Sequence, residues 1–125
     1  MSPLTFSLLS IAGGIGAATR FLIDGRLRET MHPEFEWATS IINLSGSFVL
    51  GLLTGLTDVE LVSANVSVVI GTGFLGGYTT FSTASLETVT LLRAGRHGQA
   101  LMSGVGMLVG CVALAAAGLW IGQQL

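Results

Sequence analysis

Four long apolar stretches account for almost the whole of this 125-residue chain. They run over about 4–23, 37–56, 61–92 and 98–121, and charged or turn-rich residues separate them. Each reaches the roughly 20 residues that an α-helix needs to cross a hydrocarbon core about 30 Å thick. Only 10% of the residues are charged, against about 25% in ordinary soluble domains. The sequence therefore predicts an all-α membrane protein with four transmembrane helices, in a single four-span domain over 1–125.

The positions of the positive charges indicate how the chain is oriented. The first stretch is expected to stay in the mature protein, because no basic segment precedes it and its apolar run is too long for a signal peptide. All five cationic side chains lie at the ends of the first and third stretches or in the loops that follow: Arg20, Arg26, Arg28, Arg93 and Arg96. The cytoplasmic bias of Lys and Arg places these loops inside and both termini outside. We expect a multi-pass protein of the plasma (inner) membrane.

The third stretch is interrupted by Gly71–Glu87, in which glycines are followed by a run of hydroxyl side chains. Gly76 and Gly77 are expected to break the helix near the middle of the membrane, over 76–79. Backbone groups freed in lipid need protein, ions or water as partners. A broken helix at this depth is typical of a transport site.

A second half-helix is expected to begin around Thr79 or Thr80. Its N-terminus directs partial positive charge and unpaired N–H groups at the middle of the membrane. Hydroxyl donors lie beside Phe81, whose ring edge carries positive quadrupole charge, and they come from Thr79, Ser82, Thr83 and Ser85. Together these groups favour an anion or a small polar solute.

The second stretch carries a polar stripe, because Thr39, Asn43 and Ser47 follow helical spacing. The two N–H donors of Asn43 suit an anion or a carbonyl on a neighbouring helix, and this stretch alone favours the neighbouring helix. In the fourth stretch Ser103 is the only polar contributor expected. Arg20 lies toward the cytoplasmic end of the first stretch, where a long side chain can snorkel to the interface; the functional alternative is that it helps to draw an anion toward a vestibule.

Two contacts between the stretches are also expected. The connection over 57–60 is short, so the second and third spans should pack as antiparallel neighbours. Glu87 comes one turn or more after the hydroxyl cluster, near the inner interface. A carboxylate there needs a partner or water; Arg93 or Arg20 is the expected partner in a helix-end ion pair, and a gating or proton-relay role for Glu87 is the alternative.

No catalytic or metal site is expected from the side chains. His32 and His97 lie in separate loops without a partner at metal-ligand spacing. Cys111 is the single cysteine, so disulfides and cysteine clusters are excluded, and we expect it to be a small buried hydrophobe. The hydroxyls of Ser82 and Thr83 have no His, Lys or Asp within the membrane to act as a base, so the chain is not expected to be an enzyme.

Three motifs in this chain resemble the Fluc (CrcB) fluoride channels. They are GGIGAATR at 13–20, NLSGSF at 43–48, and GFLGGYTTFST at 73–83 followed by Ser85 and Glu87. The resemblance covers the first three stretches in order. It implies a passive, fluoride-selective channel that lets accumulated fluoride leave the cell and so confers fluoride resistance. It also implies an antiparallel dimer of dual topology, with two pores and a structural sodium ion at its centre.

The resemblance assigns roles to particular residues. It implies that backbone carbonyls of Gly76 and Thr79 hold the sodium ion. It implies that matching positions line the fluoride path: Asn43, Phe81, Ser82 and Thr83, with Arg20 near the vestibule. The polar stripe and the fourth stretch add Ser47 and Ser103 to this candidate path.

The chain departs from the family pattern in two ways. Ala84 stands three residues after Phe81, where a second pore phenylalanine is expected. In addition, every arginine favours one orientation, whereas an antiparallel homodimer needs the chain to insert both ways. The resemblance includes chains encoded as pairs of opposite orientation that form heterodimers. We hypothesise that this chain can be one half of such a heterodimer, with a partner that completes the pores.

Two other functions remain open at this point. A small proton-coupled multidrug exporter would need a carboxylate deep in an early span to exchange protons for substrate, and the first two stretches have none. A non-conducting assembly subunit would need only the glycine strips that let helices approach closely.

Overall fold

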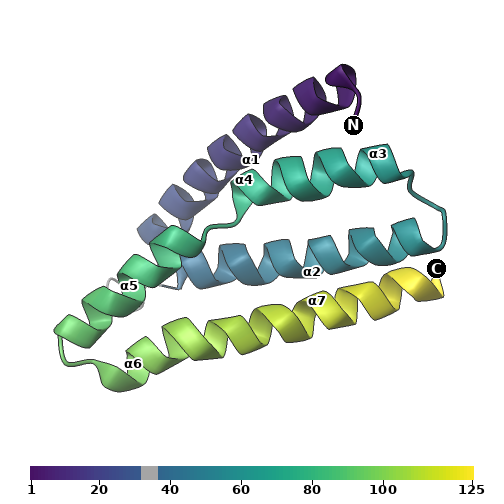
Figure 1. Ribbon diagram of the computed structural model, residues 1–125. Helices are drawn as coiled ribbons and strands as arrows, with labels where there is room; N and C mark the ends of the chain where they lie inside the picture. Colours follow the sequence, from purple (N-terminus) through teal and green to yellow (C-terminus); the bar gives the residue numbers. More distant parts are fainter. Residues whose placement is uncertain (32–36) are drawn as a thin grey trace.

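The chain forms an all-helical bundle in a computed structural model that describes residues 1–31 and 37–125. The helices come in four groups along the chain, and the third group is bent (Figure 1). In order they are α1 (Pro3–Thr30), α2 (Ala38–Asp58), α3 (Ala64–Ser67), the π-helical η1 (Val68–Leu75), α4 (Gly76–Tyr78), α5 (Phe81–Arg93), α6 (His97–Leu101), the π-helical η2 (Met102–Gly106) and α7 (Met107–Gln124). The predicted four-helix fold with an interrupted third helix is confirmed.

Three helices of the described part are long and apolar enough to cross a membrane: Pro3–Thr30, Ala38–Asp58 and His97–Gln124. The third predicted span is divided between shorter elements on either side of its break. Helix α1 continues beyond the predicted end at residue 23. Its 28 residues cover about 42 Å at 1.5 Å per residue, which exceeds a hydrocarbon core of about 30 Å. The extra length carries Arg26 and Arg28 beyond the apolar part of the helix.

Glycines determine which helices lie closest together. Helix α2 packs mainly against α7, and α1 packs mainly against η1 and α4 (Figure 1). A Cβ at Gly51 would meet the backbone of Ala115 in α7, and a Cβ at Gly16 would meet the carbonyl of Phe74 in η1. These helices therefore touch backbone to backbone. The second and third helices also contact each other, but each packs more closely against another neighbour, α2 against α7 and the third helix against α1.

Both chain termini lie at one end of the bundle, as Figure 1 shows. The C-terminal end of α1 and the turn between α5 and α6 lie at the other end. Arg26 and Arg28, near the C-terminal end of α1, and Arg93 and Arg96, around the turn after α5, are therefore gathered at one end of the molecule. This placement agrees with the charge pattern on which the predicted orientation rests.

Candidate functional site

The third helix breaks at Thr79 and Thr80 rather than at Gly76 and Gly77. Thr79 (ψ 159°) and Thr80 (φ −147°, ψ 124°) have extended backbones, whereas the two glycines are helical. β-branched residues adopt extended backbone readily. The Thr80 hydroxyl also caps α5, because its Oγ1 accepts the Thr83 N–H at 3.3 Å. Gly77 serves packing instead, since a Cβ there would meet the backbone of α1.

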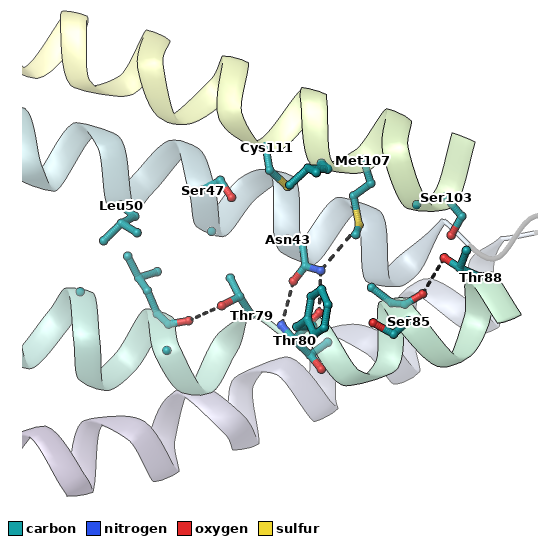
Figure 2. Close-up of a pocket in the computed structure, with 18 of the residues that line it drawn as sticks. Asn43, Ser47, Leu50, Thr79, Thr80, Ser85, Thr88, Ser103, Met107 and Cys111 are labelled. Atoms are coloured by element: carbon teal, nitrogen blue, oxygen red, sulfur yellow. Dashed lines mark hydrogen bonds between the residues drawn. The ribbon is translucent and has the colours of Figure 1, made fainter. Parts of the chain in front are cut away.

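The side chain of Asn43 binds both backbone polar groups of Thr80 (Figure 2). Its Oδ1 accepts the Thr80 N–H at 2.8 Å, and its Nδ2 donates to the Thr80 carbonyl at 2.8 Å. The same Nδ2 lies 3.6 Å from Sδ of Met107 on α7. Asn43 is buried. Its amide therefore bonds neighbouring helices. This is the role that the sequence of the second stretch favoured over contact with an anion.

The break leaves several carbonyls, among them those of Gly76 and Thr79, without their helical donors. In a continuous α-helix, the Thr80 N–H would donate to the Gly76 carbonyl and the Thr83 N–H to the Thr79 carbonyl. Here the two N–H groups donate to Asn43 Oδ1 and Thr80 Oγ1. The carbonyls of Gly76 and Thr79 are thus available to another partner.

An open groove of about 610 Å³ runs along the break, between α2, the third helix and the η2–α7 helix (Figure 2). It brings together several predicted residues: Asn43, Ser47, Phe81, Ser103, Gly76 and Thr79. It is also lined by Ser85, a predicted hydroxyl donor of the second half-helix, and by polar or sulfur-containing residues for which no such role was predicted: Thr80, Thr88, Met107 and Cys111. The spacing of 81, 85 and 88, which places these residues on one face of a helix, was the available signal for Thr88. Cys111 is half-buried at the groove and is not a core residue as expected.

Ser82, Thr83 and Arg20 do not line the groove. Ser82 is exposed at the first turn of α5. Thr83 is half-buried, and its Oγ1 lies 3.2 Å from Oγ1 of Thr80. Arg20 is half-buried and stands well before the end of α1, because this helix runs on to Thr30.

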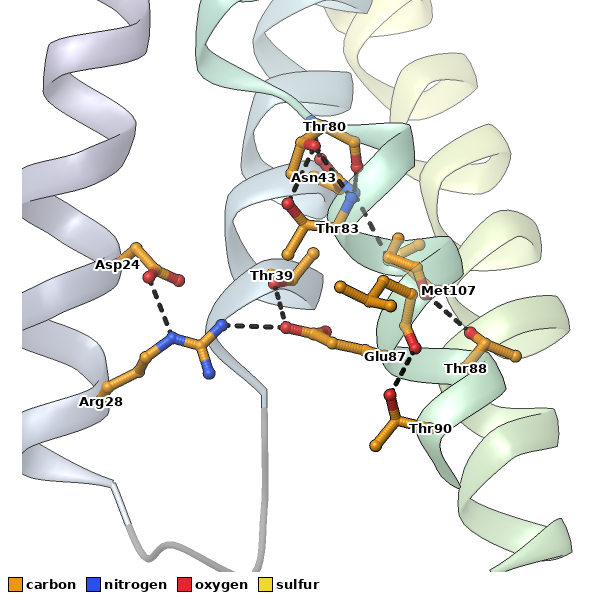
Figure 3. Close-up of polar contacts among 12 residues, drawn as sticks. Asp24, Arg28, Thr39, Asn43, Thr80, Thr83, Glu87, Thr88, Thr90 and Met107 are labelled. Carbon is orange, nitrogen blue, oxygen red and sulfur yellow. Dashed lines mark hydrogen bonds and ion pairs between the residues drawn. The ribbon is translucent and has the colours of Figure 1, made fainter. Parts of the chain in front are cut away.

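Glu87 lies on a separate polar face of α5 (Figure 3). Its Oε1 accepts the Thr39 hydroxyl at 2.8 Å and Nη2 of Arg28 at 2.9 Å. The prediction that Arg93 or Arg20 pairs with Glu87 is therefore wrong. Arg93 is six residues further along the same helix and points to another side. Arg28 reaches Glu87 because α1 extends beyond its predicted end.

His97 is not among the residues that line the groove. His97 is exposed at the start of α6. His32 lies outside the described residues.

Comparisons with known proteins cover nearly the full length of the chain. The family model described as CrcB-like protein, Camphor Resistance (CrcB), matches residues 7–119. "Fluoride-specific ion channel FluC 1" of Leifsonia xyli subsp. xyli is 45% identical over 98% of this chain and 89% of its own length. The FluC 1 protein of Rubrobacter xylanophilus is 40% identical over 96% and 98%. FluC 2 of Moorella thermoacetica is 42% identical over 88% and 87%.

Proposed function

The chain belongs to the CrcB-like family, and on this premise we propose that it is a fluoride-specific ion channel that releases cytoplasmic fluoride passively down its electrochemical gradient. It is a multi-pass membrane protein and not an enzyme. The observation that carries the proposal is the groove at the break, where hydroxyls and an aromatic edge gather within apolar helices. Fluoride is small and strongly hydrated, so a selective path must replace its water with closely spaced donors.

We place the path along the groove and around the N-terminus of α5. Ser47 and Ser103 contribute hydroxyls from facing helices, and Phe81 contributes its ring edge. Ser82 and Thr83 add hydroxyls at the N-terminus of α5, whose dipole favours an anion. In addition, Arg20 contributes positive charge from α1, and Asn43 shapes the path by fixing Thr80.

A second chain completes this path in our proposal. Phe81 is 86% exposed in the single chain, although its ring belongs to the proposed path. Ala84 also lines the groove, where a larger residue would narrow it. An antiparallel dimer would cover Phe81, whereas Ala84 is already buried in the single chain. The clustering of arginines at one end favours a partner of opposite fixed orientation, and a second copy is the alternative.

A structural sodium ion fits the two carbonyls at the break. Hard cations take oxygen ligands, and the carbonyls of Gly76 and Thr79 have lost their helical donors. One chain offers fewer oxygens than such an ion gathers, so the second chain or water must supply the rest. We expect that purification with N-methylglucamine in place of sodium weakens the dimer, measured by light scattering. A dimer equally stable without sodium would contradict this assignment.

The channel proposal is tested by fluoride release from liposomes that contain the purified chain alone. A potassium gradient with valinomycin drives the anion, and fluoride and chloride electrodes record both ions. We expect fluoride release without chloride release, which would also show that one sequence suffices. If neither ion leaves, the chain is co-purified with a family member of opposite loop charge. Failure with that partner, or release of chloride as well as fluoride, would contradict the proposal.

Phe81→Ile provides the internal check of the path in the same vesicles. We expect fluoride release to fall by about tenfold, because isoleucine removes the positive ring edge. The fold should survive, since this side chain is mostly exposed in the single chain. Normal release from this variant would remove Phe81 from the path.

A further inference from the structure

A row of polar groups follows one face of α5 and ends in a cluster of charges (Figure 3). It starts at the break, where Oγ1 of Thr80 lies 3.2 Å from Oγ1 of Thr83. One turn later it reaches Glu87, which accepts the hydroxyl of Thr39 from α2 at 2.8 Å. Arg28 closes the row from α1. The row thus connects the break with the end of the molecule where the arginines gather.

The carboxylate of Glu87 is the difficult group in this row. Its side chain is only 11% exposed, and buried carboxylates are costly unless they are paired. An uncompensated negative charge here would also repel an anion that leaves the break along this face, because screening by water is weak at buried sites.

Arg28 supplies the compensating charge. Its Nη2 donates to Glu87 Oε1 at 2.9 Å, while its Nε donates to Asp24 Oδ2 at 2.9 Å. Asp24 is one turn earlier on α1, and the second bond holds the guanidinium plane in place. The arginine is therefore oriented toward Glu87 before any ion arrives.

We propose that Arg28 is a positioning residue for conduction: it pairs with Glu87, shares its positive charge between this carboxylate and the more exposed Asp24, and holds Glu87 in place, so that fluoride can pass the polar face of α5. This assignment rests on the proposed channel function. If the Arg28–Glu87 ion pair only held α1 against α5, loss of either residue would break this contact equally. Charge compensation instead makes loss of the arginine harmful only while the carboxylate remains.

The experiment compares fluoride release from vesicles that contain Arg28→Gln, Glu87→Gln or both changes. We expect Arg28→Gln to slow release by about tenfold, because it leaves a buried carboxylate without its counter-charge. Adding Glu87→Gln should restore at least half of the lost rate. Arg93→Gln is the matched control, because it removes an exposed positive charge from the end of the same helix; its rate should stay within about twofold of wild type, as expected for a screened surface charge.

If the double variant releases fluoride as slowly as Arg28→Gln, the ion pair only holds α1 against α5, and the assignment is overturned. Arg28→Lys keeps the charge and covers the case in which the glutamine variant does not fold; a rate near wild type is expected, and a rate as slow as that of Arg28→Gln would also overturn it. Size-exclusion profiles identify folded variants. If the wild-type chain releases no fluoride with or without a partner, the channel proposal fails and this assignment with it. Wild-type release together with an unchanged rate in folded Arg28→Gln would reject the assignment alone.

Discussion

Asn43→Ala is expected to reduce fluoride release by at least about tenfold, because it removes both hydrogen bonds that hold Thr80 at the break. A backbone group left without a partner costs about 1–3 kcal/mol when it is buried, and alanine leaves the Thr80 N–H without one, because the Thr80 carbonyl, at the N-cap, still accepts the first helical bond of α5. The first turn of α5 then loses its fixed position relative to α2. Release is measured in the liposome assay, together with hydrogen exchange at the amides of residues 79–83. Faster exchange at these amides is the signature of a lost anchor.

Two variants define what Asn43 does. Asn43→Asp keeps an acceptor for the Thr80 N–H but places an oxygen opposite the Thr80 carbonyl, so it should also conduct poorly. Ser45→Ala is the matched control, because Ser45 lies two residues away on α2 and its hydroxyl contacts Ile42 and Tyr78. We expect this control to release fluoride at nearly the wild-type rate and to keep slow exchange at residues 79–83. Unchanged release and exchange in Asn43→Ala would show that the break does not depend on this amide.

The helices were predictable because lipid leaves the backbone little choice. A stretch of about 20 apolar residues must satisfy its own N–H and C=O groups, and such stretches in this chain form helices with nearly the expected ends. The exception is α1, which continues beyond its apolar part to Thr30. Apolarity marks where a helix can lie in lipid, but it does not mark where the helix ends in water. The partner of Glu87 was missed for this reason.

The site was less predictable because its details depend on contacts between distant residues. Gly76 and Gly77 suggested a local break, yet Gly77 is needed where the third helix touches α1. The extended residues are the threonines that follow, and Asn43 supplies their partners from another helix. Local sequence identifies the groups that need partners in lipid. It does not identify which helix provides them.

Gly16→Ala is expected to have the largest effect on folding. An added Cβ would meet the carbonyl of Phe74, so backbone faces backbone and no side chain can move aside. Helix α1 would have to shift away from η1 and α4, which include the Gly76 carbonyl proposed for sodium. Such overpacking costs about 1–3 kcal/mol or more. Alanine is more favourable than glycine in a helix by about 1 kcal/mol, and this gain offsets part of the overpacking cost. The net loss of stability in Gly16→Ala therefore measures how rigid the contact between α1 and η1 is.

Gly14→Ala is the matched control for this contact. It lies two residues earlier on α1, and among the described residues nothing lies within 4 Å of its added Cβ. We expect this variant to be as stable as wild type or slightly more stable, because only the helix-propensity gain applies. Thermal unfolding of the purified variants, followed by size-exclusion chromatography, compares the two. Equal stability of Gly16→Ala and Gly14→Ala would mean that α1 and the third helix do not touch through their backbones. The Arg28 assignment would then lose its support, because the same helix carries Arg28 to Glu87.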